Sequence, residues 1–243
     1  MATQTAVQMG GIEVLSEKAH SMTGMQSMAS KMWAPWLVMG FMIVMISLII
    51  GAIVANTASD YFSFTKEVRE AAVANSDIAD KKAFIEATKA WLPTFKFLGL
   101  GLIMGGITFA LATILGNLKT GGGRVQEAIG KGTMELKPPM TAKMFPMVMM
   151  MGMMVLMIAV VVGIIDGFLT YDYWNHSVAT ELNPAAAGSS LLSDLGTIST
   201  IKLWLEPLKF VGIAMLLSGI GLALATIVPV LRWQASRLWE VLS

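Results

Sequence analysis

Methionine is the residue type with the most obvious potential for binding chemistry in this sequence. The chain contains 21 Met, no Cys and only two His. Thioether sulfur is a soft donor that suits Cu(I), so helix faces lined with Met are candidate copper sites. The best candidates occur as matching pairs in two similar segments: Met39 with Met151, and Met45 with Met157. Because Met is also a flexible apolar filler, we expect no cofactor, with copper as the alternative.

An acidic side chain in an apolar stretch is the second candidate. Asp166 lies in the sequence Ile-Ile-Asp-Gly at the end of such a stretch. Ionisable residues at membrane depth are usually functional, whereas a position one turn from water would make Asp166 an ordinary boundary residue. His176 follows Asp172 and is close to Asp166 in the sequence. A metal or proton site is one interpretation of these three residues, and a solvated loop histidine is the other.

Four charged residues border the apolar stretches in a regular way. Asp60 and Asp172 each follow one stretch and precede a Tyr, while Lys96 and Lys209 each precede another stretch. If all four lie at the outer membrane surface, one interfacial ion pair forms in each half of the chain, Asp60 with Lys96 and Asp172 with Lys209. Such charges fix the depth of a membrane hairpin. A polar gate or an ion-binding rim is the functional alternative.

The sequence lacks the residues that independent catalysis would need. Without Cys, the chain has no disulfides, iron–sulfur ligands or catalytic thiolates. It contains no paired-carboxylate motif, no HExxH zinc motif and no Ser/His/Asp order of a catalytic triad. A net charge of +1 creates no field that attracts nucleic acid. We expect no nucleic-acid partner and no enzyme activity of its own, although the chain would fit a non-catalytic subunit of a membrane enzyme complex.

The elements that position these residues are four apolar windows without charge. Hydrophobic residues make up 55% of the chain and charged residues only 14%, compared with about 25% charged in soluble domains. Each window exceeds the roughly 20 residues that a membrane-spanning helix needs. The windows run between Lys31 and Asp60, Lys96 and Lys119, Lys143 and Asp166, and Lys209 and Arg232. The sequence predicts an all-α integral membrane protein with four transmembrane helices.

The second half of the chain resembles the first. Residues 91–115 align without gaps on residues 204–228, with nearly half of the positions identical. The preceding spans match as well, since Met39-Gly40 corresponds to Met151-Gly152. This pattern predicts a tandem duplication of a two-helix hairpin. Because each unit has an even number of spans, the repeats are parallel and related by a pseudo-twofold axis along the membrane normal.

These spans and repeats divide the chain into five segments. Basic residues crowd the short linker between the repeats, which by the positive-inside bias makes both termini cytoplasmic. In the first outer loop, Ser76 is placed to cap a helix. The polar N-terminal segment has no signal peptide, and the lack of an import signal and of Cys favours a prokaryotic cytoplasmic or intracytoplasmic membrane. The segments are an N-terminal segment 1–30, a first repeat 31–118 with outer loop 60–96, a Gly/Pro-containing linker 119–142, a second repeat 143–231 with outer loop 166–209, and an amphipathic C-terminal segment 232–243.

Small residues four apart occur in the second and fourth spans. Such spacing lets helix backbones approach closely in lipid. We expect these spans to form a close-packed pair or to contact a partner; the alternative is that Gly is merely common in membrane helices. The pairs are Gly101/Gly105 and Gly106/Ala110 in the second span, and Ala214/Ser218 and Gly219/Ala223 in the fourth.

Together these features favour a structural role in the membrane. We expect a non-catalytic, structural or accessory transmembrane subunit that lies in the lipid bilayer and packs laterally against other transmembrane subunits, in a hetero-complex or a homo-oligomer. The competing hypothesis is a channel or transporter for a small solute or copper that uses the Met-lined helix faces.

Overall fold

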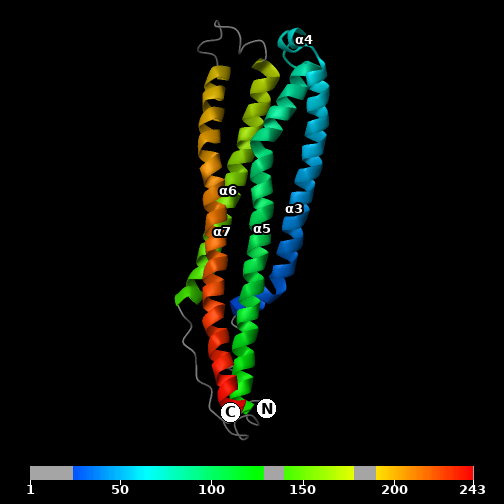
Figure 1. Ribbon diagram of the computed structural model, residues 1–243. Coiled ribbons are helices and arrows are strands. Elements are labelled where there is room, and N and C mark those ends of the chain that lie inside the picture. The colour runs from blue at the N-terminus through cyan, green and yellow to red at the C-terminus, as the bar shows by residue number, and fades with distance from the viewer. Residues whose placement is uncertain (1–23, 129–139, 178–189, 243) are drawn as a thin grey trace, which may run out of the picture. The chain divides into compact units, whose positions relative to one another are not determined.

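The computed structural model describes residues 24–128, 140–177 and 190–242, and these residues are almost entirely helical. Four long helices and one short one follow each other along the chain (Figure 1). The helices are α3 (Gly24–Ser63), α4 (Lys66–Glu70), α5 (Asp77–Ala128), α6 (Met140–Ser177) and α7 (Ser190–Leu242). The predicted all-α fold is confirmed.

Each long helix contains a stretch that is long and apolar enough to cross a membrane. The four stretches are Ser27–Ser63, Asp77–Leu118, Met144–His176 and Ser193–Arg232. They contain the four windows that the sequence predicts. The prediction of an integral membrane protein with four spanning helices is therefore confirmed at this level.

The helices continue well past the charged residues that border the apolar windows. Helix α5 begins at Asp77 and α6 ends at Ser177, so much of the segments 60–96 and 166–209 is helical rather than loop. Ser76 caps α5 as expected, because its hydroxyl accepts a hydrogen bond from the backbone N–H of Ala79 (3.3 Å). A charge marks the end of an apolar stretch, but a helix ends only where its backbone bonds end.

The chain forms two compact units, and every long helix contributes to both. Among the described residues, unit 1 comprises 24–37, 104–128, 140–150 and 216–242. Unit 2 comprises 38–103, 151–177 and 190–215. Each unit thus takes segments from both predicted repeats.

Unit 1 has an apolar core made mainly of small side chains. Its fully buried members are Ala29, Ala112, Phe145 and Ala223. The Trp36 ring packs edge-on against Phe109, with 5.0 Å between ring centroids. A buried hydroxyl bridges two helices here, because Thr226 on α7 lies 2.8 Å from the Thr141 hydroxyl on α6 and 2.9 Å from the Leu222 backbone oxygen of its own helix.

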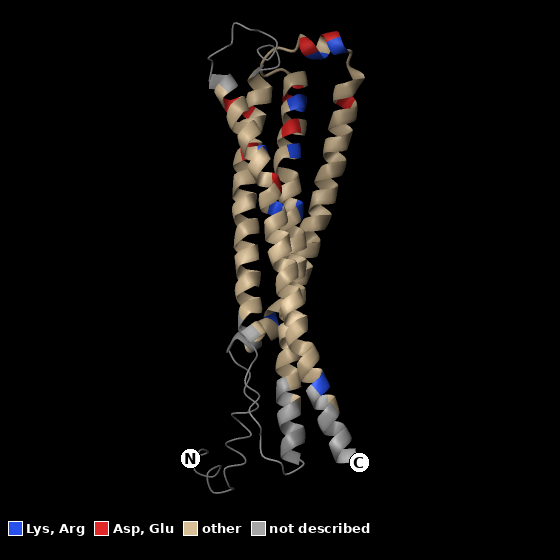
Figure 2. Cartoon of the chain, turned by 60° about the vertical axis from the view of Figure 1, so that its left-hand side comes forward, with Lys and Arg blue, Asp and Glu red and all other residues tan. Residues whose placement is uncertain are grey.

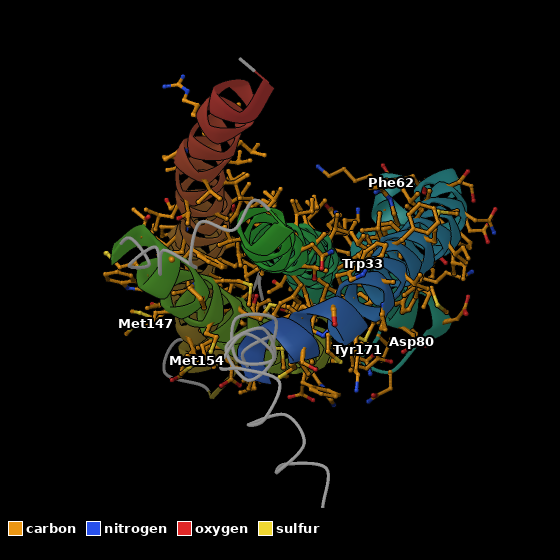
Figure 3. All side chains as sticks on the ribbon, turned by 90° about the horizontal axis from the view of Figure 1, so that it is seen from below. Trp33, Phe62, Asp80, Met147, Met154 and Tyr171 are labelled. Atoms are coloured by element: carbon orange, nitrogen blue, oxygen red, sulfur yellow. The ribbon has the colours of Figure 1, made fainter. Side chains whose placement is uncertain are left out.

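In unit 2, polar contacts join the N-terminal end of α5 to the C-terminal end of α6. Tyr171 on α6 donates a hydrogen bond to the Asp80 carboxylate on α5, and the two side chains lie side by side in Figure 3. The Asn175 amide donates to the Asn75 side chain (3.0 Å). The Lys82 ammonium lies 4.5 Å from the centroid of the Trp174 ring. These contacts fix the register between α5 and α6.

Candidate functional site

The most unusual site in the structure is a group of buried polar side chains in unit 2. Asp166 and Thr170 lie one helical turn apart on α6 and are 0% exposed, and Thr94 on α5 is 1% exposed. Both Asp166 carboxylate oxygens and the two threonine hydroxyls have no hydrogen-bond partner among the described residues. Thr94 lies against Gly163, and Thr170 is seven residues farther along α6, so these three residues are spread over about 10 Å of the contact between α5 and α6; we call them together the Asp166 cluster. Buried polar atoms are nearly always paired in proteins, so this cluster requires an explanation.

Glycines on α6 bring α5 close to the Asp166 cluster. A Cβ atom added at Gly163 would lie 2.7 Å from Thr94 Oγ1, and one added at Gly167 would lie 2.9 Å from Trp91 Cδ1. The missing side chains therefore let α5 pack directly on the α6 backbone. Asp166 and Thr170 follow these glycines by three residues each, on the same buried side of α6. The close approach of the helices keeps the cluster away from solvent.

One cationic residue acts on the cluster from a third helix. The ammonium of Lys202 on α7 attracts the Asp166 carboxylate electrostatically, but Lys202 itself is exposed. A buried ionised carboxylate needs a close partner charge or several donors. The Asp166 carboxylate therefore lacks such a partner among the described residues.

The sequence points to Asp166 but not to the rest of the cluster. Thr94 and Thr170 are uncharged and Thr is common in helices, so neither stands out. A signal was nevertheless present, because Thr170 follows Asp166 by four residues and Gly163 and Gly167 share the same spacing. Polar and small residues at that spacing indicate one buried helix face.

The small residues of α5 contact α3. A Cβ atom added at Gly106 would lie 3.0 Å from the backbone oxygen of Trp33, and one at Gly105 would lie 2.9 Å from the Trp36 ring. Gly101 is buried in unit 2, and Ala110 is half-buried in unit 1. The second span thus uses its glycines against the first span.

The small residues of α7 divide into two groups. Gly219 and Ala223 are buried, and Gly219 lies against α6, where an added Cβ would be 3.6 Å from the Phe145 backbone oxygen. Ala214 and Ser218 are exposed. The contacts of the α5 glycines Gly105 and Gly106 and of Gly219 on α7 therefore lie within their own hairpins. The second and fourth spans meet instead through the Phe97 and Phe210 rings, whose centroids are 5.5 Å apart.

The four candidate copper ligands lie at the surface of unit 2. Met39, Met45, Met151 and Met157 are between 43 and 54% exposed. The neighbouring Met154 is also at the surface of α6 (Figure 3). Nor do the described residues include a group of three or more His, Asp or Glu side chains that could hold a metal ion.

The expected interfacial ion pairs are not brought together by this fold. Gly40 lies against Gly99; Lys96 is three residues from Gly99, whereas Asp60 is twenty residues from Gly40. At 1.5 Å per residue, Asp60 and Lys96 are about 25 Å apart along the helices. The reason is that α5 continues far beyond Lys96, so the lysine does not mark the outer end of its helix.

The second hairpin differs from the expected pairing in the same way. Lys209 is 2% exposed and forms an ion pair with Glu206 on its own helix, with 2.8 Å between Nζ and Oε1. Its ammonium also lies 5.5 Å from the Phe97 ring centroid. Asp172 lies 3.4 Å from His176 near the C-terminal end of α6. Asp166 is ten residues from His176, about 15 Å along the helix, so these residues do not form one site.

Comparisons of the chain with protein-family models, with curated proteins and with solved structures find no match.

Proposed function

We propose that this chain is a non-catalytic transmembrane subunit that packs laterally against other transmembrane helices in a larger assembly. The observation that carries the proposal concerns α3 and α5 in unit 2. Where the two helices lie beside each other, α5 exposes charged side chains whereas α3 exposes apolar ones.

Two contacts fix the register of α3 and α5 in unit 2. Gly40 lies against Gly99, and the Lys82 ammonium lies 5.8 Å from the Tyr61 ring centroid. Between these contacts α3 exposes Ile46, Ile49 and Ile53, among other apolar residues. Over the same stretch α5 exposes Lys89 and Lys96. Figure 2 shows charged residues along this part of α5, whereas residues 41–59 of α3 contain none.

Neither water nor lipid suits both surfaces at this level. If the level lies in the bilayer, each lysine near its centre costs about 2.5–3.5 kcal/mol. If it lies outside, the exposed isoleucines lose about 25 cal/mol for each Å² of apolar area left in water. A second protein that covers one of the two surfaces removes this conflict, and a membrane helix is the simplest such partner.

A face of small residues on α7 gives the proposal further support in unit 1. Ser218, Gly221 and Ala225 are exposed and lie on one side of the helix. A Cβ atom added at Gly221 meets nothing within 4 Å. Small residues are typical of helix–helix interfaces in membranes, where close approach replaces the hydrophobic effect as the driving force.

We also propose that the chain arose by tandem duplication of a two-helix hairpin with parallel repeats. Supporting contacts lie at corresponding positions in unit 1: Gly106 approaches the backbone oxygen of Trp33, and Gly219 approaches that of Phe145. Trp33 and Phe145 are separated by the same number of residues as Met39 and Met151. Both termini on the cytoplasmic side of a prokaryotic membrane remains part of this proposal.

The alternative function, a channel or transporter for a small solute or copper, has less support. The four candidate methionines are exposed rather than enclosed in unit 2, as would suit contact with lipid or a neighbouring chain. Copper therefore remains a secondary proposal that metal analysis tests directly.

The test is the size and composition of the particle extracted from its native membrane in mild detergent. We expect a large particle with other subunits in fixed stoichiometry, and no copper. Gly221→Leu should disrupt this particle, because a bulky side chain blocks close helix approach. The matched control is Val161→Leu, which adds bulk at another exposed position. A monomer in mild detergent, or a particle indifferent to Gly221→Leu, would contradict the proposal.

A further inference from the structure

We propose that the exposed face of α7 around Trp204 and Pro207 packs on α3 of a second copy of this chain, at the face that contains Gly51 and Ala55. This inference names a partner for the proposed lateral packing, and it rests on the proposed duplication. The residues that carry it all lie in unit 2.

The contact between α5 and α6 is the template for this interface. Trp91 on α5 packs on Gly167 of α6, and Thr94 packs on Gly163. A Cβ atom added at Gly167 would lie 3.3 Å from the Trp91 Cβ, so the two helices approach closely. Helix α5 contains the second span of the first repeat, and α6 contains the first span of the second repeat. This contact therefore joins one repeat to the next.

Helix α7 carries the counterparts of these α5 residues on an exposed face. In the alignment of the two repeats, Trp204 corresponds to Trp91 and Pro207 to Thr94. Leu203 and Trp204 are 74% and 71% exposed, and Pro207 is also exposed. Thr94, by contrast, is only 1% exposed. In the described part of the chain, this face of α7 is therefore uncovered.

Helix α3 carries the counterparts of the two α6 glycines, and this face is open as well. In the alignment of the first spans, Gly51 corresponds to Gly163 and Ala55 to Gly167. A Cβ atom added at Gly51 meets nothing within 4 Å, and Ala55 is exposed. One chain thus presents both halves of a second contact of the α5–α6 type, which favours another copy of the chain as the partner.

The α3 face also lacks the unpaired polar groups that α6 buries. Asp166 and Thr170 correspond to Val54 and Ala58, so a copy that packs there buries no carboxylate or hydroxyl at these positions. Small residues on one helix allow close approach of another helix in lipid, and the Trp204 ring supplies a large apolar contact area. The interface between copies therefore avoids the cost of the Asp166 cluster.

Such an interface is heterologous, because α7 of one copy contacts α3 of the next. Each added copy presents a new free face of each kind, so assembly continues until a ring closes. The proposal therefore predicts crosslinks between α7 and α3 of different copies.

Disulfide crosslinking in the native membrane tests this prediction, and the absence of Cys from the chain removes any background. One tagged copy carries Trp204→Cys, and a differently tagged copy carries Ala55→Cys. Oxidation should yield a disulfide-linked dimer that contains both tags. No such dimer, or dimers only between copies with the same substitution, would overturn the proposal.

A chain that carries both substitutions gives a second readout. It should form a ladder of linked copies on a non-reducing gel, whereas a disulfide within the single chain would overturn the proposal. The pair Pro207→Cys and Gly51→Cys gives the same test with Trp204 in place, and it decides the outcome if the Trp204→Cys chain does not fold.

Two further pairs serve as controls. Trp91→Cys/Gly167→Cys should form a disulfide within one chain, because the Cβ separation of 3.3 Å is close to the disulfide range of about 3.5–4.5 Å. Failure of this disulfide would remove the template and overturn the proposal. Ile53→Cys replaces Ala55→Cys on the opposite, exposed side of α3 and should give roughly tenfold less dimer. Equal yields for Ile53→Cys and Ala55→Cys would indicate random collision and overturn the proposal.

The result is separable from that of the proposed accessory role. Gly221→Leu tests the packing of α7 in unit 1 and should leave the crosslink in unit 2 intact. A large particle with other subunits but without the crosslink would overturn this inference and leave the accessory role standing. The crosslink in a particle without other subunits would support the inference and count against the accessory role.

Discussion

The two compact units bury different kinds of side chain. In unit 1 the core is apolar and includes Ala29, Phe145 and Leu216, and the buried Thr226 hydroxyl is hydrogen-bonded to Thr141. Unit 2 buries Lys209 and the carboxylate of Asp166 in addition to apolar residues. Uncompensated buried charge is destabilising, and a chain that needed only a stable bundle would gain by replacing it. Of the described residues, the buried charged side chains, Asp166 and Lys209, thus lie in unit 2.

The largest loss of stability is expected for a substitution that tests close backbone packing in unit 2. A Cβ atom at Gly40 would lie 2.7 Å from the Gly99 backbone oxygen and 2.8 Å from the Ile103 backbone nitrogen. Backbone atoms cannot move aside as a side chain can, so Gly40→Leu should destabilise the protein by about 3 kcal/mol or more. Denaturant unfolding in mixed micelles measures the change.

Gly51→Leu is the control for this experiment. It lies on the same helix, and an added Cβ there meets nothing within 4 Å. Its stability should stay within about 0.5 kcal/mol of wild type. Equal losses for both variants would show that the Gly40–Gly99 contact is not what holds α3 to α5 in unit 2.

The second prediction concerns the ion pair between Lys209 and Glu206 in unit 2. We expect the loss of the carboxylate charge and the loss of the ammonium to change the stability by different amounts. Glu206→Gln leaves the Lys209 ammonium buried without its counter-charge, whereas Lys209→Met leaves only the largely exposed Glu206 carboxylate. Breaking a fully buried pair costs about 3–5 kcal/mol; because Glu206 is exposed, we expect a loss of about 1–2 kcal/mol for Glu206→Gln. Lys209→Met should cost less, or even stabilise. Equal losses in equilibrium unfolding would contradict this.

Some features of the fold and of the candidate site could be predicted from the sequence, and others could not. The four spanning helices were predictable, because uncharged apolar windows report directly on membrane insertion. Asp166 was predictable as a candidate, because a charge beside such a window is conspicuous. The helix ends were not predictable. A charged residue such as Lys96 or Asp166 marks the end of an apolar stretch, whereas the helix itself continues past it. That misplacement also produced the expected Asp60–Lys96 and Asp172–Lys209 pairs, which the long helices keep apart.

The threonines of the Asp166 cluster show a different limit. Three neighbouring threonines on α5 and α6, Thr88, Thr94 and Thr170, are equally buried, but only Thr88 bonds to its own helix. Whether a hydroxyl turns to its own backbone or to a neighbouring helix depends on packing across helices. A single sequence does not carry that information.

The third prediction tests the satisfied hydroxyl of unit 1. Thr226→Val removes the hydrogen bond to Thr141 and should destabilise the protein by about 0.5–1.5 kcal/mol. Thr141→Val should have a similar effect. Because both variants remove the same bond, the double variant Thr141→Val/Thr226→Val should lose less than the sum of the two. Strictly additive losses in this double-mutant cycle would mean that the bond does not stabilise unit 1.

The smallest effect is expected at the exposed methionines of unit 2. Replacing Met39, Met45, Met151 and Met157 together with Leu conserves volume at surface positions, so stability should change by less than about 0.5 kcal/mol per site. Metal analysis of wild type and variant, purified side by side from copper-supplemented cells, should show no copper in either. If wild type instead retains copper and the variant loses it, the exposed methionines bind copper and the channel or transporter hypothesis gains over the structural role. The absence of copper in both would leave the methionines as apolar surface, as suits contact with lipid or a neighbouring chain.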